Sequence, residues 1–203
     1  MRDMPPVSIP RSSCDEGCRL ILKRTIAYTE AAEHLFLKDR KQEAYVLSFL
    51  AMDECGKFLL IAKTLRSSTA DPITVTGFSD HNAKYGEVLD NNKRLVNSSG
   101  AKIALGLSKM FDLSEIAKLN YQALANGSIL SEARTVNTDP LRYRNEAFYV
   151  DFVDGWKSPR YPGDEVCAAQ IKLVKGAAKS YLYFIENEGL QWLIDSEYLG
   201  STR

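Results

Sequence analysis

The stretch that decides the fold is QEAYVLSFLAMDECGKFLLIAKTL, which occupies residues 42–65. In an α-helix successive side chains are about 100° apart, so residues three and four positions apart share a face. On that projection the apolar residues form a single stripe. The stripe consists of Leu47, Leu50, Ala51, Cys55, Phe58, Ile61, Ala62 and Leu65. The stretch therefore predicts a long helix with one face buried in a core.

The segments on both sides of this stretch have helical patterns of their own. Apolar residues recur at helical spacing over residues 15–38, and residues 39–41 form a short polar link. Two long helices joined by such a link are expected to pack antiparallel. Further helices are predicted over residues 81–96, over 101–125 as one helix or two, from Pro140 to Val153, and from a cap at Asp164 through Trp192 and beyond. The predicted fold is an all-α bundle of long antiparallel helices with shorter accessory helices.

Residues 1–13 differ from the rest of the chain because they contain three prolines and little periodicity. This composition predicts a flexible or loosely docked N-terminal arm. The remaining residues, 14–203, are expected to form a single helical domain. The one strand-like stretch is residues 73–76.

Charge and hydropathy limit the class of protein. The 203 residues contain 26 basic and 26 acidic side chains, so the formal net charge is zero. A neutral chain has no global field that attracts nucleic acid, and a polyanionic partner would need a local cluster of cations. The sequence has no apolar run near the ~18 residues that a membrane span needs, and its N-terminus lacks the apolar core of a secretory signal. We therefore expect a cytoplasmic protein that has no membrane partner.

The four cysteines suit a reducing compartment better than a framework of disulfides. Cys14 and Cys18 are four positions apart, but no second pair of Cys or His residues lies near enough in sequence to complete a zinc site. We predict neither a metal site nor a cofactor.

Glu54 is the first polar residue that stands out, because it falls in the middle of the apolar stripe. An ion buried without a partner costs several kcal/mol, so Glu54 should be paired, protonated or facing a wet cleft. Lys57, one turn further along, is a candidate partner. Gly56, on the opposite face, costs about 1 kcal/mol relative to alanine unless close packing requires it. A purely structural ion pair would also explain Glu54.

His81 and Lys84 form a second polar cluster near the start of a predicted helix. At positions i and i+3 the two side chains share a face and can converge on one site. The chain has only one other histidine, His34, so proton transfer near neutral pH has few candidates. At a helix N-terminus the cationic form of His81 is disfavoured by the helix dipole, which suits a base. The alternative is that His81 is a capping or surface residue beside Asp80.

Arg142 and Arg144 belong to a third cluster in the segment LRYRNEAFYVD, residues 141–151. The planar guanidinium group suits the geometry of phosphate and carboxylate. One alternative is that Arg142 or Arg144 is the counter-ion of Glu54, which would account for both anomalies together.

Three of these segments occur in an order and at spacings that resemble a known family. They are AMDECGK at residues 51–57, HNAK at 81–84 and RNEAFYVD at 144–151. Together they resemble the AbiV-type abortive infection proteins, a branch of the HEPN superfamily of helical bundles. The resemblance extends over about residues 14–183. It implies a HEPN-like homodimer that acts on RNA or on the translation machinery during phage infection, with a phage-encoded protein as activator.

The resemblance also suggests roles for particular residues. Many HEPN ribonucleases use an RN-x-x-x-H box, in which Arg and His from two subunits face each other and cut RNA without metal. Arg144 and Asn145 match the start of the box, whereas Tyr149 occupies the position of its histidine. A tyrosine whose pKa is about 10 is a poor base at neutral pH, although it can donate a hydrogen bond or orient a phosphate. In this scheme His81 takes the place of the missing histidine.

The predicted site therefore has two groups of residues. The catalytic candidates are His81, Arg144 and Tyr149, and the binding or orienting candidates are Glu54, Lys57, Lys84, Arg142 and Asn145. Three functions remain open for them. The cluster binds RNA, the translation machinery or a phage protein; or it is the centre of a metal-independent ribonuclease toxin; or the chain is a non-catalytic protein-interaction module in which Glu54 and Arg144 form a buried bridge.

Overall fold

The computed structural model describes residues 5–97, 140–148, 151–152, 156–157, 159 and 161–195. Its elements in chain order are β1 (Val7–Ile9), α1 (Arg11–Leu37), α2 (Lys41–Ser67), β2 (Ile73–Val75), α3 (His81–Asn97), α7 (Pro140–Phe148), β3 (Asp151–Phe152), β4 (Trp156–Lys157), α8 (Asp164–Asn187) and α9 (Leu190–Asp195). Helices dominate, so the prediction of an all-α fold is confirmed. The helix or helices predicted over residues 101–125 lie outside the described residues.

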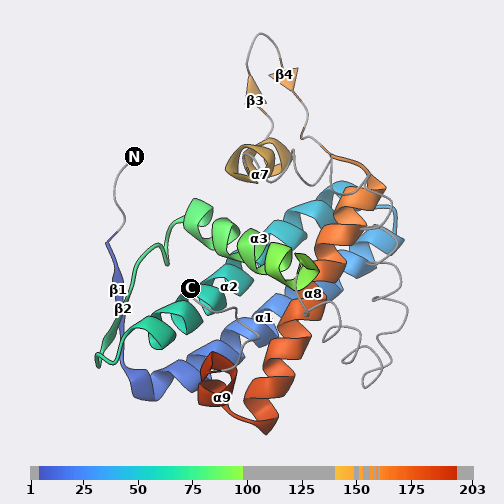
Figure 1. The fold of residues 1–203 in the computed structure, drawn as a ribbon. Helices are drawn as coiled ribbons and strands as arrows, with labels where there is room; N and C mark the ends of the chain where they lie inside the picture. Colours follow the sequence, from blue (N-terminus) through green and yellow to red (C-terminus); the bar gives the residue numbers. More distant parts are fainter. Residues whose placement is uncertain are drawn as a thin grey trace.

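Helices α1 and α2 pack side by side and antiparallel, as predicted (Figure 1). Arg11, the first residue of α1, donates hydrogen bonds to Asp71 and to the carbonyl of Ser68, both just beyond the end of α2. The link between the helices contains Asp39 at φ 60°, a left-handed conformation that aspartate tolerates better than most residues. The tight link and the contact at the far end together fix the helix pair.

Helix α8 packs against both α1 and α2 and completes a three-helix bundle (Figure 1). Arg19 of α1 donates to the carbonyl of Ile185 near the end of α8, so these two helices are antiparallel. Gln170, near the start of α8, donates to the hydroxyl of Ser48 in α2 at 2.6 Å. Helix α2 contacts α3 and α7 as well as α1 and α8, and it is buried over much more of its circumference than the single predicted stripe.

Residues 7–13 contain regular structure that their composition did not indicate. Within residues 1–13, where an arm was predicted, residues 7–9 form β1, which pairs antiparallel with β2 in the register Val7 to Val75. Helix α1 begins at Arg11 instead of near residue 15. The strand-like stretch at 73–76 therefore has a partner from the segment that looked least structured.

Two predicted helices end earlier than expected. Helix α7 begins at Pro140 as predicted but ends at Phe148, and β3 and β4 follow it as a short antiparallel pair. The last predicted helix is broken at Gly189, whose φ of 86° is left-handed, so α8 and α9 are separate. The N-cap of α8 is Gly163, and Asp164 is its first helical residue.

Helix α3 crosses α2 where Gly56 removes a side chain from the contact. A Cβ atom added to Gly56 would lie 2.5 Å from the carbonyl oxygen of Lys84 and 2.6 Å from its Cβ, which is closer than real atoms approach. In the turn before α3, Gly77 has φ 74°, and a Cβ there would lie 2.6 Å from the Cβ of Ala83. These two glycines let the first turns of α3 lie directly on α2. A glycine is expected at position 56 only if another element packs closely there, and the structure shows that close packing.

The described residues bear on three general properties. None of the described helices is long and apolar enough to cross a membrane. The four cysteines are buried free thiols. Within the described ranges, histidine, cysteine, aspartate and glutamate side chains form no group of three that could hold a metal ion.

The helix crossing gives a test of the fold. Gly56→Ala should destabilise the protein by about 1–3 kcal/mol, because the new methyl group forces α3 away from α2. Gly176→Ala is the matched control, since a Cβ at this position of α8 meets no atom within 4 Å. The control should be neutral or stabilising by up to about 1 kcal/mol. Urea unfolding of both variants measures the difference, and equal stability would contradict the crossing.

Candidate functional site

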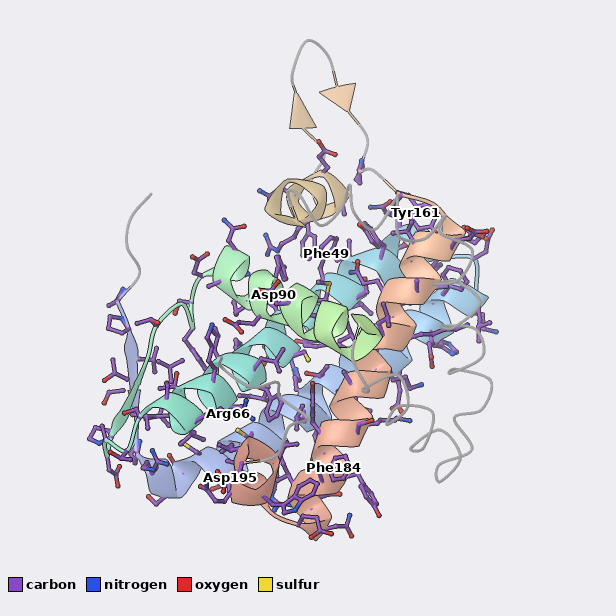
Figure 2. The ribbon with its side chains drawn as sticks, viewed as in Figure 1. Phe49, Arg66, Asp90, Tyr161, Phe184 and Asp195 are labelled. Carbon is purple, nitrogen blue, oxygen red and sulfur yellow. The ribbon has the colours of Figure 1, made fainter. Side chains whose placement is uncertain are left out.

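The polar side chains of the predicted site gather where α2, α3 and α7 meet. Helix α7 lies against the end of the bundle where α2 begins, and Gln42 of α2 donates to the carbonyl of Ala147 at 2.7 Å (Figure 1). Phe49, labelled in Figure 2 between α3 and α7, contacts the ring of Tyr85 with 5.8 Å between centroids. The rings of Phe49 and Tyr85 thus form apolar packing next to the polar groups.

Asp53 is the centre of the cluster. Its Oδ2 accepts a hydrogen bond from Nζ of Lys84 at 2.6 Å, and its Oδ1 lies 2.6 Å from Nδ1 of His81. The side chain of Lys84 is 3% exposed and that of Asp53 is 12% exposed, so this ion pair is almost completely removed from water. Asp53 thus binds two side chains of α3 from within α2.

The pKa of Asp53 reflects two opposed effects. Burial alone would raise this pKa, because a charged carboxylate loses its hydration. The hydrogen bonds from Lys84 and His81, together with their charges, outweigh that effect and hold the pKa below its ordinary value. Asp53 is therefore ionised at neutral pH, as the ammonium group of Lys84 requires.

His81 is the most accessible member of the cluster, with 37% of its side chain exposed. Its ring stacks on that of Tyr85, with 6.1 Å between the centroids and 26° between the planes. The carboxylate of Asp53 at one ring nitrogen and the aromatic face of Tyr85 hold the imidazole in a defined orientation. An oriented imidazole at the edge of a buried charge cluster is suited to proton transfer.

The hydroxyl of Tyr85 lies near both the carboxylate of Asp53 and Arg144 of α7. The Tyr85 side chain is fully buried, and burial is the main cause that raises the pKa of its hydroxyl group. The charge of Asp53 raises this pKa further, while the charge of Arg144 opposes the increase, so both groups lie near the hydroxyl. Within the described part of the chain, neither Oη of Tyr85 nor Nε of Arg144 has a hydrogen-bond partner of good geometry.

Arg144 is held by its own helix. Its guanidinium carbon lies 4.6 Å from the ring centre of Phe148, and its Nη1 donates to Oδ1 of Asn145 at 3.1 Å. Asn145 is exposed, while Arg144 is half-buried. Helix α7 therefore places a cation near the hydroxyl of Tyr85.

Glu54 belongs to a separate ion pair. Its Oε1 accepts a hydrogen bond from Nζ of Lys57 at 2.7 Å, and the two side chains are 21% and 25% exposed. Nζ of Lys57 also lies 5.8 Å from the ring centre of Phe78. Of the partners considered for Glu54, the structure shows Lys57. The carboxylate buried at the centre of α2 is its neighbour Asp53.

Two predicted residues are not part of this geometry. Arg142 is a residue of α7, but its side chain is not among those described. Tyr149 lies outside the described residues. The structure therefore joins His81 and Lys84 through Asp53, places Arg144 near the hydroxyl of Tyr85, and keeps Glu54 and Lys57 as a separate pair.

Sequence reasoning overlooked Asp53 and Tyr85. A signal for Asp53 was present, because Gly56 lies three residues further along and so shares its face. A glycine in mid-helix marks a close approach of another helix. On that helix, His81 and Lys84 share a face, and a buried lysine needs a carboxylate as its counter-ion. The signal for Tyr85 was weaker, since an aromatic residue in a helix is usually explained by the core alone.

The comparisons with known proteins give one family. A family model described as AbiV, HEPN_AbiV, matches residues 13–178. The matched range contains all of α2, α3 and α7, and so every residue of the Asp53 cluster. No curated protein and no solved structure matches the chain.

The Asp53 pair gives a stability prediction. Asp53→Asn leaves the buried ammonium group of Lys84 without its counter-ion and should cost about 3–5 kcal/mol of unfolding free energy. Glu54→Gln is the matched control, because it breaks only the partly exposed pair with Lys57 and should cost less than about 1 kcal/mol. Chemical denaturation of both variants decides the matter. A larger loss of stability for Glu54→Gln would contradict the prediction, because Glu54 and not Asp53 would then be the more important carboxylate.

The Asp53–Lys84 ion pair also predicts how the stability of the protein changes at acidic pH. A carboxyl group whose pKa is lower in the folded state adds stability above its unfolded pKa of about 3.9, and the added stability is lost as the pH falls through the folded pKa. The stability difference between wild type and Asp53→Asn should therefore shrink as the pH falls from about 5 to about 2. Urea unfolding at several pH values tests this, and a difference that grows on acidification would refute it.

Proposed function

Because the chain belongs to the AbiV family of HEPN proteins, we propose that it is an antiphage abortive-infection protein that acts on RNA or on the translation machinery. The observation that carries this role is the family match over residues 13–178. In this proposal the protein works in the cytoplasm as a homodimer, and a phage-encoded protein activates it. The arrest of the infected cell then limits the spread of the phage.

The Asp53 cluster supports an anionic partner such as RNA. The chain as a whole is neutral, so attraction to a polyanion has to come from a local group of cations. At this site Lys84 and His81 bind one carboxylate and Arg144 lies near the adjacent hydroxyl of Tyr85, and His81 and Arg144 are both partly accessible. The guanidinium group suits phosphate oxygens, because it presents several N–H donors in one plane.

A second candidate function is metal-independent cleavage of RNA, and the Asp53–His81 contact favours it. In this reaction His81 takes the proton of a ribose 2′-hydroxyl group, and the 2′-oxygen bonds to the adjacent phosphorus. The bond from phosphorus to the 5′-oxygen breaks, a water molecule gives that oxygen its proton, and His81 returns the proton it took to the solvent. Arg144 stabilises the charge that develops on the phosphoryl oxygens. His81 would thus do the work of the histidine that Tyr149 replaces in the RN-x-x-x-H pattern.

A phage challenge tests the proposal. Cells that express the wild-type chain should survive as a population and give fewer plaques than cells without it, and His81→Ala and Arg144→Ala should lose most of that protection. His34→Ala is the control, because His34 lies in the last turn of α1 and outside the cluster. Equal protection by wild type, His81→Ala and Arg144→Ala would exclude this site.

RNA from the same infected cells separates the two candidate functions. If the chain is a ribonuclease, new RNA ends should form with the wild type and decrease by about 10²–10⁴-fold with His81→Ala, the range for loss of a general base. Intact RNA with arrested protein synthesis would favour binding over cleavage.

A further inference from the structure

Two residues contact the imidazole of His81: Asp53 at one ring nitrogen and Tyr85 on one face of the ring. Its Nδ1 faces Oδ1 of Asp53 at 2.6 Å, and its ring stacks on that of Tyr85. The remaining ring nitrogen, Nε2, is not used by either contact. Since 37% of the side chain is exposed, His81 is partly accessible to solvent.

The other oxygen of Asp53 fixes the carboxylate itself. Oδ2 accepts from Nζ of Lys84, a donor that has no accepting capacity and is almost completely buried. Lys84 thus restrains the carboxylate from rotating and favours its ionised form, which the contact with His81 favours as well. Asp53 is then an acceptor only, so a hydrogen bond at its Oδ1 requires a proton on Nδ1 of His81.

We propose that Asp53 is a positioning residue that holds His81 in the tautomer protonated on Nδ1 and leaves Nε2 as the proton acceptor of the site. Tyr85 supports the arrangement by fixing the ring plane. Lys84 supports it by occupying the second carboxylate oxygen. This inference deepens the proposed function, and it rests on that function only for the use of Nε2 on RNA.

The tautomer can be measured without any activity. In full-length protein labelled with ¹⁵N, a two-bond ¹H–¹⁵N correlation spectrum distinguishes a protonated ring nitrogen from an unprotonated one. The chain has only His34 and His81, so His34→Gln assigns both spectra. At a pH well above the ordinary imidazole pKa of about 6.5, His81 should show a protonated Nδ1 and an unprotonated Nε2. The opposite pattern in the wild type would overturn the proposal.

A pair of variants isolates the carboxylate. Lys84→Met keeps Asp53 beside His81 and should leave the tautomer unchanged. Adding Asp53→Leu to it removes the acceptor and should abolish the preference for a protonated Nδ1. The double variant replaces both charges of the buried pair with apolar side chains, which is usually tolerated because no ion is left unpaired.

Glu54→Gln provides the matched control for a nearby carboxylate, because Glu54 contacts Lys57 and not His81. It should leave the His81 spectrum unchanged. An unchanged tautomer in the Asp53→Leu/Lys84→Met protein, or a change in Glu54→Gln, would show that Asp53 does not set it.

The spectrum and the phage challenge can refute the two proposals independently of each other. If His81 has the predicted tautomer but His81→Ala still protects cells, the positioning role of Asp53 stands and the use of His81 on RNA is refuted. If protection needs His81 but its Nε2 carries the proton in the wild type, the positioning role is refuted and the antiphage function stands.

Discussion

The carboxylate of Asp53 is the constraint on which the rest of the site depends. It lies within the most enclosed helix of the bundle and binds two residues of α3, one through each oxygen. Lys84 cannot be buried without it, because an unpaired ammonium group in this position would cost several kcal/mol. The ion pair therefore fixes the side chains of α3 that face α2, and the same carboxylate orients His81.

The backbone and the charges at this crossing support each other. Gly56 allows α3 to approach until the main chain of Lys84 occupies the space of a side chain. The Lys84 side chain then reaches back to Asp53, one turn before the glycine in α2. Helix α7 adds Arg144 near the hydroxyl of Tyr85. A chain whose net charge is zero thus concentrates cationic groups at one junction of three helices.

The sequence was sufficient to predict the parts of the fold that depend on the spacing of apolar residues within one helix. The helices at 42–65 and 81–96 and the start at Pro140 follow from apolar spacing and capping residues, and the structure has them. The order of AMDECGK, HNAK and RNEAFYVD pointed to the AbiV family, which the family match shows. The strand at residues 7–9 was not predictable in this way, because it depends on pairing with residues 73–75.

The candidate site was predictable in part for a similar reason. His81, Lys84 and Arg144 stand out as rare or charged residues in helical positions, whereas choosing between Asp53 and Glu54 needs the direction from which α3 arrives. A one-residue difference on a helix is a rotation of about 100°, and only tertiary packing decides which carboxylate is enclosed. Burial on nearly all sides of α2 made the single stripe an incomplete guide.

The most direct test of this account is a double-mutant cycle between Asp53 and Lys84, measured by urea unfolding of the wild type, Asp53→Asn, Lys84→Met and the double variant. If the buried pair holds α3 on α2, the two substitutions should be coupled by about 2–3 kcal/mol, the upper part of the range for residues in contact. A coupling energy below about 0.5 kcal/mol would mean that the two side chains act independently, and the central role of Asp53 would be wrong.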